Sequence, residues 1–251
     1  MHLVHWGKKY KHGTHGEARN PRKALDCFLG GAEKGCAAAM VDGGLMLWER
    51  GDKAEAVRWY KQAAEMGDRV GQTNLAIALQ SGEGTERQPR EAIRWFKLAA
   101  DGGNDRAQYS LALSYQKGIG VEQDAGRAAY WYNRAARLEN RRAMYNLALC
   151  YQDGVGVRKD RALSRSWMRR AAAAGHARAQ LERARLAEEE GNTTEALVYC
   201  NLAMEGGSRE AEASLVSLTS HLSDRQLLVA AQRAEAWQPA GRRKRQRCSR
   251  A

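Results

Sequence analysis

The sequence predicts an all-α protein, a right-handed solenoid of about seven helical hairpins. The first observation is a repeated phrase: YQKGIGV begins at Tyr115, and YQDGVGV begins 36 residues later, at Tyr151. Self-similarity at a period of about 20 to 50 residues is typical of repeat proteins. The second is composition, because only three prolines occur and the abundant alanine, leucine, arginine and glutamate favour helix. The third is that equivalent residues recur at the same spacings along most of the chain.

Two sets of equivalent residues show these spacings. Members of each set are separated by 32, 36, 36, 36 and 32 residues. The first set is Cys27, Trp59, Trp95, Trp131, Trp167 and Tyr199, and the second is Ala39, Gly71, Ala107, Ala143, Ala179 and Ala211. The predicted repeats span about 1–38, 39–70, 71–106, 107–142, 143–178 and 179–210, followed by a capping hairpin at 211–239 and a basic disordered tail at 240–251.

Each repeat begins with a first helix and a glycine-containing hinge. AQYSLALSY carries apolar residues at helical spacing, which places Leu111 on a buried stripe. The small Ala112 beside it lets the partner helix approach. Gly118 and Gly120 can adopt positive φ and end the helix, and Asp124 stands where an N-cap starts the second helix. Repeats of 32 residues lack four residues here and need a tighter turn.

The second helix of each repeat carries an aromatic residue before an AA pair. We expect Trp59, Trp95, Trp131 and Trp167 to form interhelical core rather than a ladder for stacking bases. A glycine follows most second helices, at Gly35, Gly67, Gly103, Gly175 and Gly207. Glu139 occupies this position in one repeat. There we expect Asn140 to take the left-handed conformation and the joint to be distorted.

These motifs resemble a known family. The pattern A-x-x-x-L-A-x-x-Y-x-x-G-x-G-V-x-x-D, followed by W-Y-x-x-A-A, resembles the Sel1-like repeat, a relative of the tetratricopeptide repeat, over roughly residues 1 to 210. NPRKALDCFLGGAEKG, AMYNLALCY and RRAAAAGHARAQ are similar to the repeat region of plant F-box proteins, and LLVAAQRAEAWQP resembles their closing helix. The resemblance implies a protein-binding scaffold linked to an F-box ubiquitin ligase. This sequence begins inside the first repeat, so docking to a ligase adaptor is not carried over to it.

Composition and charge set the surroundings in which we expect the chain to act. The formal net charge is +12, and half of this excess lies in the closing AGRRKRQRCSRA. That tail could direct nuclear import, touch nucleic acid or solubilise the chain, and the sequence does not separate these roles. No apolar run long enough for a membrane span or a secretory signal is present. Five cysteines without repeated spacing favour free thiols in the cytoplasm or nucleus.

Motifs of catalysis and metal binding are missing from the sequence. It has no G-x-S-x-G, Walker loop, H-E-x-x-H or dinucleotide fingerprint, so we expect neither an enzyme nor a cofactor. His2, His5, His12 and His15 have a spacing that could hold zinc. Because no cysteine or carboxylate completes a compact set, we expect no metal there.

A row of polar residues predicts where a partner binds. Arginines precede three first helices and glutamines end them, and in related solenoids the first helices line the concave face. The planar guanidinium groups of the arginines can donate hydrogen bonds to the carboxylates or backbone carbonyls of an extended peptide. The candidate residues are Asn74, Gln80, Arg106, Tyr109, Gln116, Arg142, Tyr145, Asn146, Gln152 and Arg178. A solvated edge is an equal alternative, and the second helices around Arg94 and Arg169 are the next place to search.

We therefore predict a monomeric scaffold that binds a protein or peptide on its concave face. The competing hypothesis is a nucleic-acid-associated protein that uses the basic tail and the surface arginines. Binding to phosphates weakens steeply with salt, whereas a groove anchored by Tyr109 and Tyr145 should weaken less.

Overall fold

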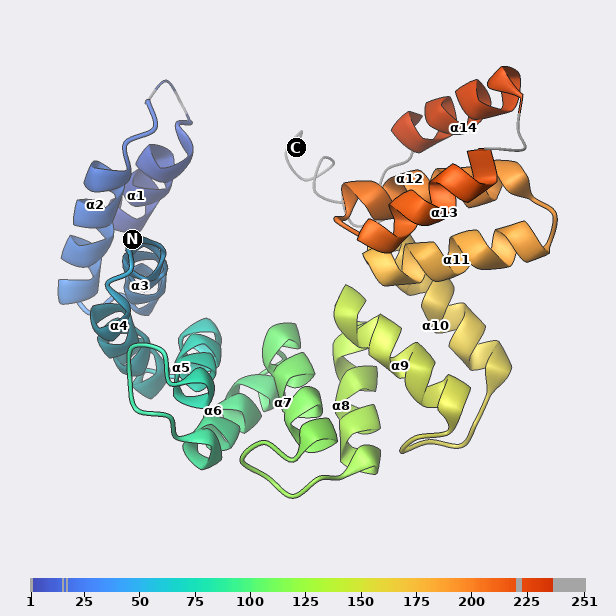
Figure 1. Ribbon diagram of the computed structural model, residues 1–251. Coiled ribbons are helices and arrows are strands. Elements are labelled where there is room, and N and C mark those ends of the chain that lie inside the picture. Colours follow the sequence, from blue (N-terminus) through green and yellow to red (C-terminus); the bar gives the residue numbers. More distant parts are fainter. Residues whose placement is uncertain (1, 15, 17, 220–222, 237–251) are drawn as a thin grey trace. The chain divides into compact units, whose positions relative to one another are not determined.

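A computed structural model describes residues 2–14, 16, 18–219 and 223–236 of the chain. Within these ranges, all regular structure is helical and no strand occurs. The 14 helices found there follow one another in pairs (Figure 1). The predicted all-α hairpin fold is therefore confirmed. The chain forms two compact units, Met1–Trp131 and Tyr132–Ala251.

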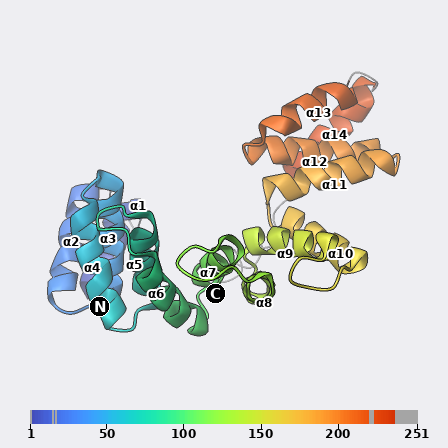
Figure 2. The ribbon, with the colours of Figure 1, turned by 60° about the horizontal axis from the view of Figure 1, so that its bottom comes forward.

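The first unit is built from repeats in which consecutive helices pack against each other. First helices of neighbouring repeats also touch, as α3 and α5 do; the α3–α4 and α5–α6 pairs are seen from another side in Figure 2. The helices are α1 (His2–His12), α2 (Pro21–Glu33), α3 (Ala37–Arg50), α4 (Lys53–Glu65), α5 (Arg69–Ser81), α6 (Pro89–Asp101) and α7 (Asp105–Lys117). Helix α8 (Ala125–Arg137) contains the boundary between the units.

The second unit continues the same pairing. Helices α9 to α13 pack in sequence, and α14 packs on α12. The helices are α9 (Arg141–Asp153), α10 (Arg161–Ala173), α11 (Ala177–Glu189), α12 (Thr193–Glu205), α13 (Arg209–Thr219) and α14 (Asp224–Ala236). The 240–251 tail, Cys248 and His15 lie outside the described residues.

The core corrects one prediction by a single position. All four tryptophans of the first set, Trp59, Trp95, Trp131 and Trp167, are only half-buried. The residue after each equivalent position is buried instead, and these residues are Phe28, Tyr60, Phe96, Tyr132, Met168 and Cys200. The Tyr60 ring lies against the partner first helix α3, since a Cβ added to Gly44 would stand 2.6 Å from it. Adjacent residues on a helix point about 100° apart, and the later one faces the core.

The two glycines of each long hinge have different tasks. Gly118 has φ of 68° and its N–H donates to the carbonyl of Ser114, so it ends α7. Gly120 has φ of 72°, and a Cβ there would lie 2.5 Å from the carbonyl carbon of Pro89. The second glycine thus lets the hinge touch the start of α6 in the preceding repeat. Asp124 Oδ1 accepts from the Arg127 N–H at 2.8 Å, which confirms the predicted N-cap.

The joint before α9 is regular, which overturns a second prediction. Glu139 itself has φ of 63°, while Asn140 has φ of −69° and caps α9. The Glu139 N–H donates to the Ala136 carbonyl at 3.1 Å, as Gly103 donates to Ala100 at 3.0 Å in the repeat before. The N-cap needs an extended backbone, so the left-handed turn falls on the residue before it. Glu139 therefore carries strain that glycine avoids.

The described cysteines, Cys27, Cys36, Cys150 and Cys200, form no disulfide. Burial raises the pKa of Cys200 to about 11, with a smaller contribution from Glu188. This thiol is therefore protonated and acts as a small core residue. Within the described ranges, no helix combines the length and apolar character needed to cross a membrane.

Candidate functional site

In the first unit, two predicted residues meet on neighbouring first helices. Arg106 at the start of α7 donates from Nη1 to Asn74 Oδ1 on α5, at 3.4 Å. The Asn74 side chain is almost enclosed, with 6 % of its surface exposed. Its Nδ2 group has no hydrogen-bond acceptor among the described residues. The pair therefore consists of an exposed guanidinium and a buried amide with a donor left over.

The charge of Arg106 also acts on Tyr60, the core tyrosine of α4. Burial raises the pKa of Tyr60, and the nearby Arg106 opposes this shift. The Tyr60 hydroxyl is thus protonated at neutral pH. Arg106, Asn74 and Tyr60 bring side chains from α7, α5 and α4 into one neighbourhood.

The other candidates of the first unit include a brace between repeats. Gln80 at the end of α5 donates from Nε2 to Ser114 Oγ on α7, at 2.9 Å. Ser114 is buried, so Gln80 joins two first helices and is not a free contact for a partner. Tyr109 is half-buried and Gln116 is exposed. Sequence reasoning missed Ser114, because serine is common and carries no motif.

In the second unit, three predicted residues surround a histidine that sequence reasoning missed. Tyr145 on α9 stacks on His176, with ring centroids 4.5 Å apart and planes inclined by 20°. Arg142 and Arg178 are exposed. Burial of His176 is the main cause that lowers its pKa, and the charges of these arginines lower it further. The remaining candidates of this unit are the half-buried Asn146 and the exposed Gln152. Because Arg106 belongs to the other unit, the single row of three arginines stays a prediction.

His176 is the N-cap of α11. Its Nδ1 accepts from the Ala179 N–H at 3.3 Å. Burial, followed by the charges of Arg141, Arg142 and Arg178, lowers the pKa of His176 to about 4. The imidazole is therefore neutral at pH 7. The signal was present in the sequence, because residues 68, 104, 140 and 176 stand at the same repeat position and only the last is histidine.

Buried glutamines hold three of the first helices, α5, α7 and α11, to the helix before each of them. The Nε2 group of each donates to a backbone carbonyl eight residues earlier. The pairs are Gln72 with Ala64 at 3.4 Å, Gln108 with Ala100 at 2.9 Å and Gln180 with Ala172 at 3.3 Å. These polar residues support the fold and are not exposed to a ligand.

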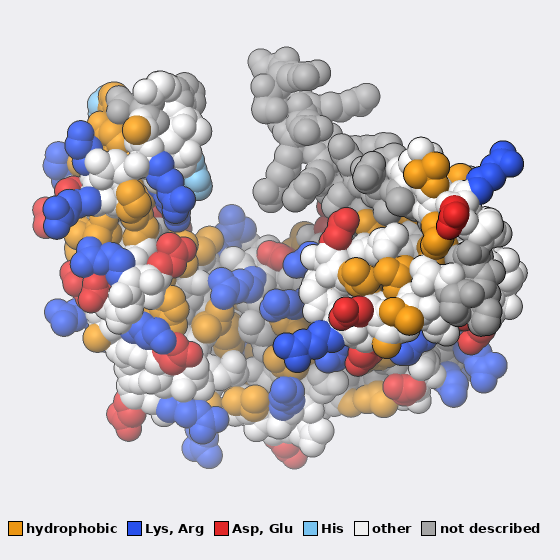
Figure 3. Space-filling model, turned by 45° about the horizontal axis from the view of Figure 1, so that its top comes forward, with side chains coloured by type: hydrophobic (Ala, Val, Ile, Leu, Met, Phe, Trp, Pro, Cys, Tyr) orange, Lys and Arg blue, Asp and Glu red, His pale blue; other side chains and the backbone are white. Residues whose placement is uncertain are grey.

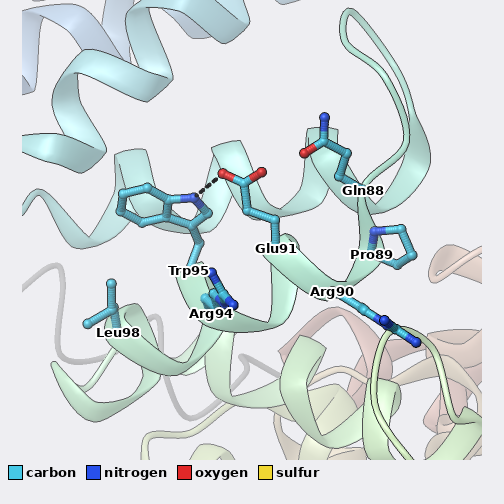
Figure 4. A pocket seen from close by; sticks show the side chains of 7 residues that line it. All are labelled: Gln88, Pro89, Arg90, Glu91, Arg94, Trp95 and Leu98. Carbon is cyan, nitrogen blue, oxygen red and sulfur yellow. Dashed lines mark hydrogen bonds between the residues drawn. The ribbon is translucent and has the colours of Figure 1, made fainter.

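Two pockets lie beside Arg94 and Arg169, the alternative positions predicted from the sequence. The first is an open, mainly apolar pocket on α6, where Trp95 donates to Glu91 Oε1 at 3.3 Å and Leu98 and Arg94 lie nearby (Figure 4). The second lies between α10 and α11 and includes Arg169. On the visible surface, basic side chains are interspersed with acidic and apolar ones (Figure 3).

Of the four histidines near the start of the chain, His2, His5 and His12 lie within the described residues. His2 Nε2 accepts from Trp6 Nε1 at 3.3 Å. Among the residues that the structure describes, no three histidine, cysteine or acidic side chains are grouped as metal ligands would be.

The repeats match a family model over most of the chain. The Sel1 repeat model matches residues 5–36, 42–68, 70–104, 105–140 and 141–176. The chain belongs to the Sel1 repeat family. Proteins of this family are generally non-enzymatic helical scaffolds for protein–protein interaction. The F-box protein At1g70590 of Arabidopsis thaliana is 59 % identical over 78 residues, which are 31 % of this Sel1-repeat chain and 22 % of that protein.

Solved structures show the same repeat fold. The c5321 antigen of uropathogenic Escherichia coli, described as displaying an SLR fold, has a TM-score of 0.74 and 29 % identity. That match covers 92 % of this chain, which spans only 51 % of the antigen chain. A Sel1 repeat protein from Oxalobacter formigenes has a TM-score of 0.67 and 30 % identity, over 72 % of this chain and 74 % of its own.

Proposed function

We propose that this Sel1-repeat chain is a non-enzymatic scaffold that binds an extended peptide segment of a partner protein on its first helices. The observation that carries the proposal is the buried Nδ2 of Asn74, which has no acceptor in the described structure. An unsatisfied buried donor costs about 1 to 3 kcal/mol. A peptide presents a carbonyl acceptor at every residue. Because Asn74 is almost enclosed, such a carbonyl would reach Nδ2 and recover this cost only where the Arg106 side chain that contacts Asn74 turns aside.

Arg106 gives the same position a charged group. Its guanidinium is exposed and contacts Asn74 through one long hydrogen bond of 3.4 Å. The Arg106 side chain can therefore turn toward a ligand with little loss of interaction energy within the fold. Charge-assisted bonds from arginine to a carboxylate are about twice as strong as neutral ones. The pair suits an extended segment with an acidic residue beside a free backbone carbonyl.

We extend the proposal to a role in substrate recognition connected with an F-box ubiquitin ligase. The support is the Arabidopsis relative, which is named an F-box protein and shares 59 % identity over 78 residues. Proximity labelling with the tagged full chain should recover ubiquitin-ligase subunits. Labelling that recovers none of them would remove this part of the proposal and leave the peptide site untouched.

The peptide site can be tested by panning a random-peptide library against the full chain. We expect selected peptides to lose at least about tenfold in affinity with Asn74→Ala or Arg106→Ala, the equivalent of one good hydrogen bond. Arg106→Ala removes the donor to Asn74 Oδ1, so it should lower the free energy of unfolding by about 1 kcal/mol, the cost of one hydrogen bond. Matched controls are Arg90→Ala and Arg94→Ala, which remove the same charge from α6.

Two results would contradict the proposal. If only the α6 variants weaken the peptides, the binding surface is the pocket at Trp95. If no peptide is selected, and a single-stranded oligonucleotide binds with an affinity that falls steeply with salt, the chain is a nucleic-acid-binding protein instead.

A further inference from the structure

The N-cap of α11 departs from the pattern of the other repeats. Three preceding first helices are capped by short acceptor side chains, Asp68, Asn104 and Asn140. At the equivalent position, α11 has His176, whose Nδ1 takes over the same acceptor role. Capping alone does not require a histidine, since asparagine serves in the two repeats before. The imidazole differs from a capping amide in carrying a second ring nitrogen, Nε2.

The cap fixes which nitrogen of His176 carries the proton. Because Nδ1 accepts from the Ala179 N–H, the neutral ring must be protonated at Nε2. Burial and three neighbouring arginines keep this ring neutral at pH 7 by lowering the pKa to about 4. The stack on Tyr145 holds the plane of the ring. In the described structure no acceptor is bonded to Nε2, which leaves an oriented N–H donor.

Arginines flank this ring in the fold, because Arg178 follows His176 by two residues on α11 and Arg142 lies one turn before Tyr145, which stacks on His176. Arg141, Arg142 and Arg178 are the charged residues that shift the pKa of His176, and no carboxylate acts on it. Arg141 is engaged, because its Nη1 donates to the Gly175 carbonyl at 3.1 Å. Arg142 and Arg178 are exposed, and neither forms an ion pair within the described residues. Neither α9 nor α11 has an acidic residue in its first turn.

We propose that Arg142, Arg178 and the Nε2–H of His176 form a binding site for an anionic oxygen group, a carboxylate or a phosphate, carried by a peptide. The three side chains supply donors and no acceptor, and two of them are guanidinium groups suited to planar, bidentate contact with such anions. The inference rests on the proposed peptide-binding function, for which it names the chemistry of one residue of the partner.

The first test uses inorganic phosphate as the probe and the full chain. We expect the imidazole resonance of His176 to shift with saturation as phosphate is added at constant ionic strength, measured by NMR. His176→Asn identifies the resonance and keeps an N-cap that this chain already uses. Arg142→Gln with Arg178→Gln should weaken the affinity for phosphate at least tenfold, roughly the loss of one charged hydrogen bond.

A matched control removes two charges elsewhere in the same unit. Arg158→Gln with Arg161→Gln lowers the net charge equally at exposed positions, and we expect unchanged phosphate affinity. If both double variants weaken binding alike, phosphate responds only to net charge and the site does not exist. The absence of a His176 shift at saturating phosphate would also overturn the proposal. Circular dichroism of each variant checks that it is folded.

A second test identifies the source of the anion. Three peptides that differ only in carrying serine, glutamate or phosphoserine at one position are compared by calorimetry. The proposal expects the glutamate or the phosphoserine peptide to bind at least about tenfold more tightly than the serine peptide, and His176→Asn to reduce that preference. If neither charged peptide gains affinity while a single-stranded oligonucleotide shifts His176, the ligand is a nucleic acid and the peptide assignment is wrong.

The two proposals fail separately. Phosphate binding at His176 requires no contact with Asn74 or Arg106. If the Asn74→Ala variant keeps its peptide affinity while the double arginine variant loses phosphate, the peptide contact at Asn74 is refuted and the anion site is supported. The opposite pattern supports the Asn74 contact and refutes the anion site.

Discussion

Replacing Phe96 with alanine should destabilise the first unit more than replacing its neighbour Trp95. Phe96 has none of its surface exposed, whereas Trp95 is half-buried and its indole N–H bonds to the exposed Glu91. Truncating a fully buried phenylalanine costs about 3 to 5 kcal/mol through lost transfer energy and the cavity left behind. For Trp95, partial burial reduces this to about 1 to 2 kcal/mol.

The two variants control each other, because they lie one position apart on α6 and remove an aromatic ring each. Urea denaturation followed by circular dichroism gives the midpoints, and hydrogen exchange of the α5 and α6 amides shows whether the loss is local. Neighbouring repeats stabilise one another, so the midpoints are compared rather than converted under a two-state assumption. If Trp95→Ala lowers the midpoint as much as Phe96→Ala, the tryptophan set is the core after all.

Three further predictions concern single residues. The pKa of His176 is about 4 in the folded chain and 6.5 when unfolded. As the pH falls, the unfolded chain therefore binds the proton before the folded chain does. The free energy of unfolding should fall as the pH drops from about 6.5 towards 4, by about 1 kcal/mol at pH 5 after allowance for solvent screening. His176→Asn should remove this part of the pH dependence of the urea midpoints. Glu139→Gly should raise the melting temperature, because it relieves about 1 kcal/mol of left-handed strain. Gly120→Ala should cost about 1 to 3 kcal/mol more than Gly118→Ala in the free energy of unfolding, since only Gly120 touches the backbone of a neighbouring repeat.

Each of these has an outcome that contradicts it. An unchanged pH dependence in His176→Asn would mean that the histidine is not shifted in the fold. Equal or lower stability of Glu139→Gly would show that the glutamate makes compensating contacts. Equal losses for the two glycine variants would mean that positive φ, and not close approach, accounts for both.

The fold could be predicted from the sequence because the spacing of equivalent residues indicates a helical repeat. The 36-residue period, the glycines that end the first helices and the capping aspartates are signals that can be read from the sequence alone. The error at Trp95 and Phe96 arose where two aromatic residues are adjacent. Both suit a helical core, and only the direction of the partner helix decides which one is buried.

The candidate site was harder to predict, because it depends on contacts between repeats. Sequence spacing indicated Arg106 and Asn74 but not their hydrogen bond. Sequence spacing also predicted that Gln80 contacts a partner, although its side chain is hydrogen-bonded to Ser114 on the next first helix. His176 was not predicted as a site residue because it matches no catalytic or metal-binding motif. Its meaning comes from being the exception in a column of capping residues.

The contact of a hinge glycine with the preceding repeat also limits how such an array can grow or shrink. A Cβ added to Gly84 would stand 2.6 Å from the carbonyl carbon of Lys53, at the start of α4. Gly120 lies in the same way against the start of α6. A deletion that is not a whole period would leave one hinge without a helix start to rest on. Removing or duplicating one full period of 36 residues restores that contact, wherever in the repeat the exchange begins. Recombination in this gene is therefore expected to change the length of the middle of the chain in whole-repeat steps.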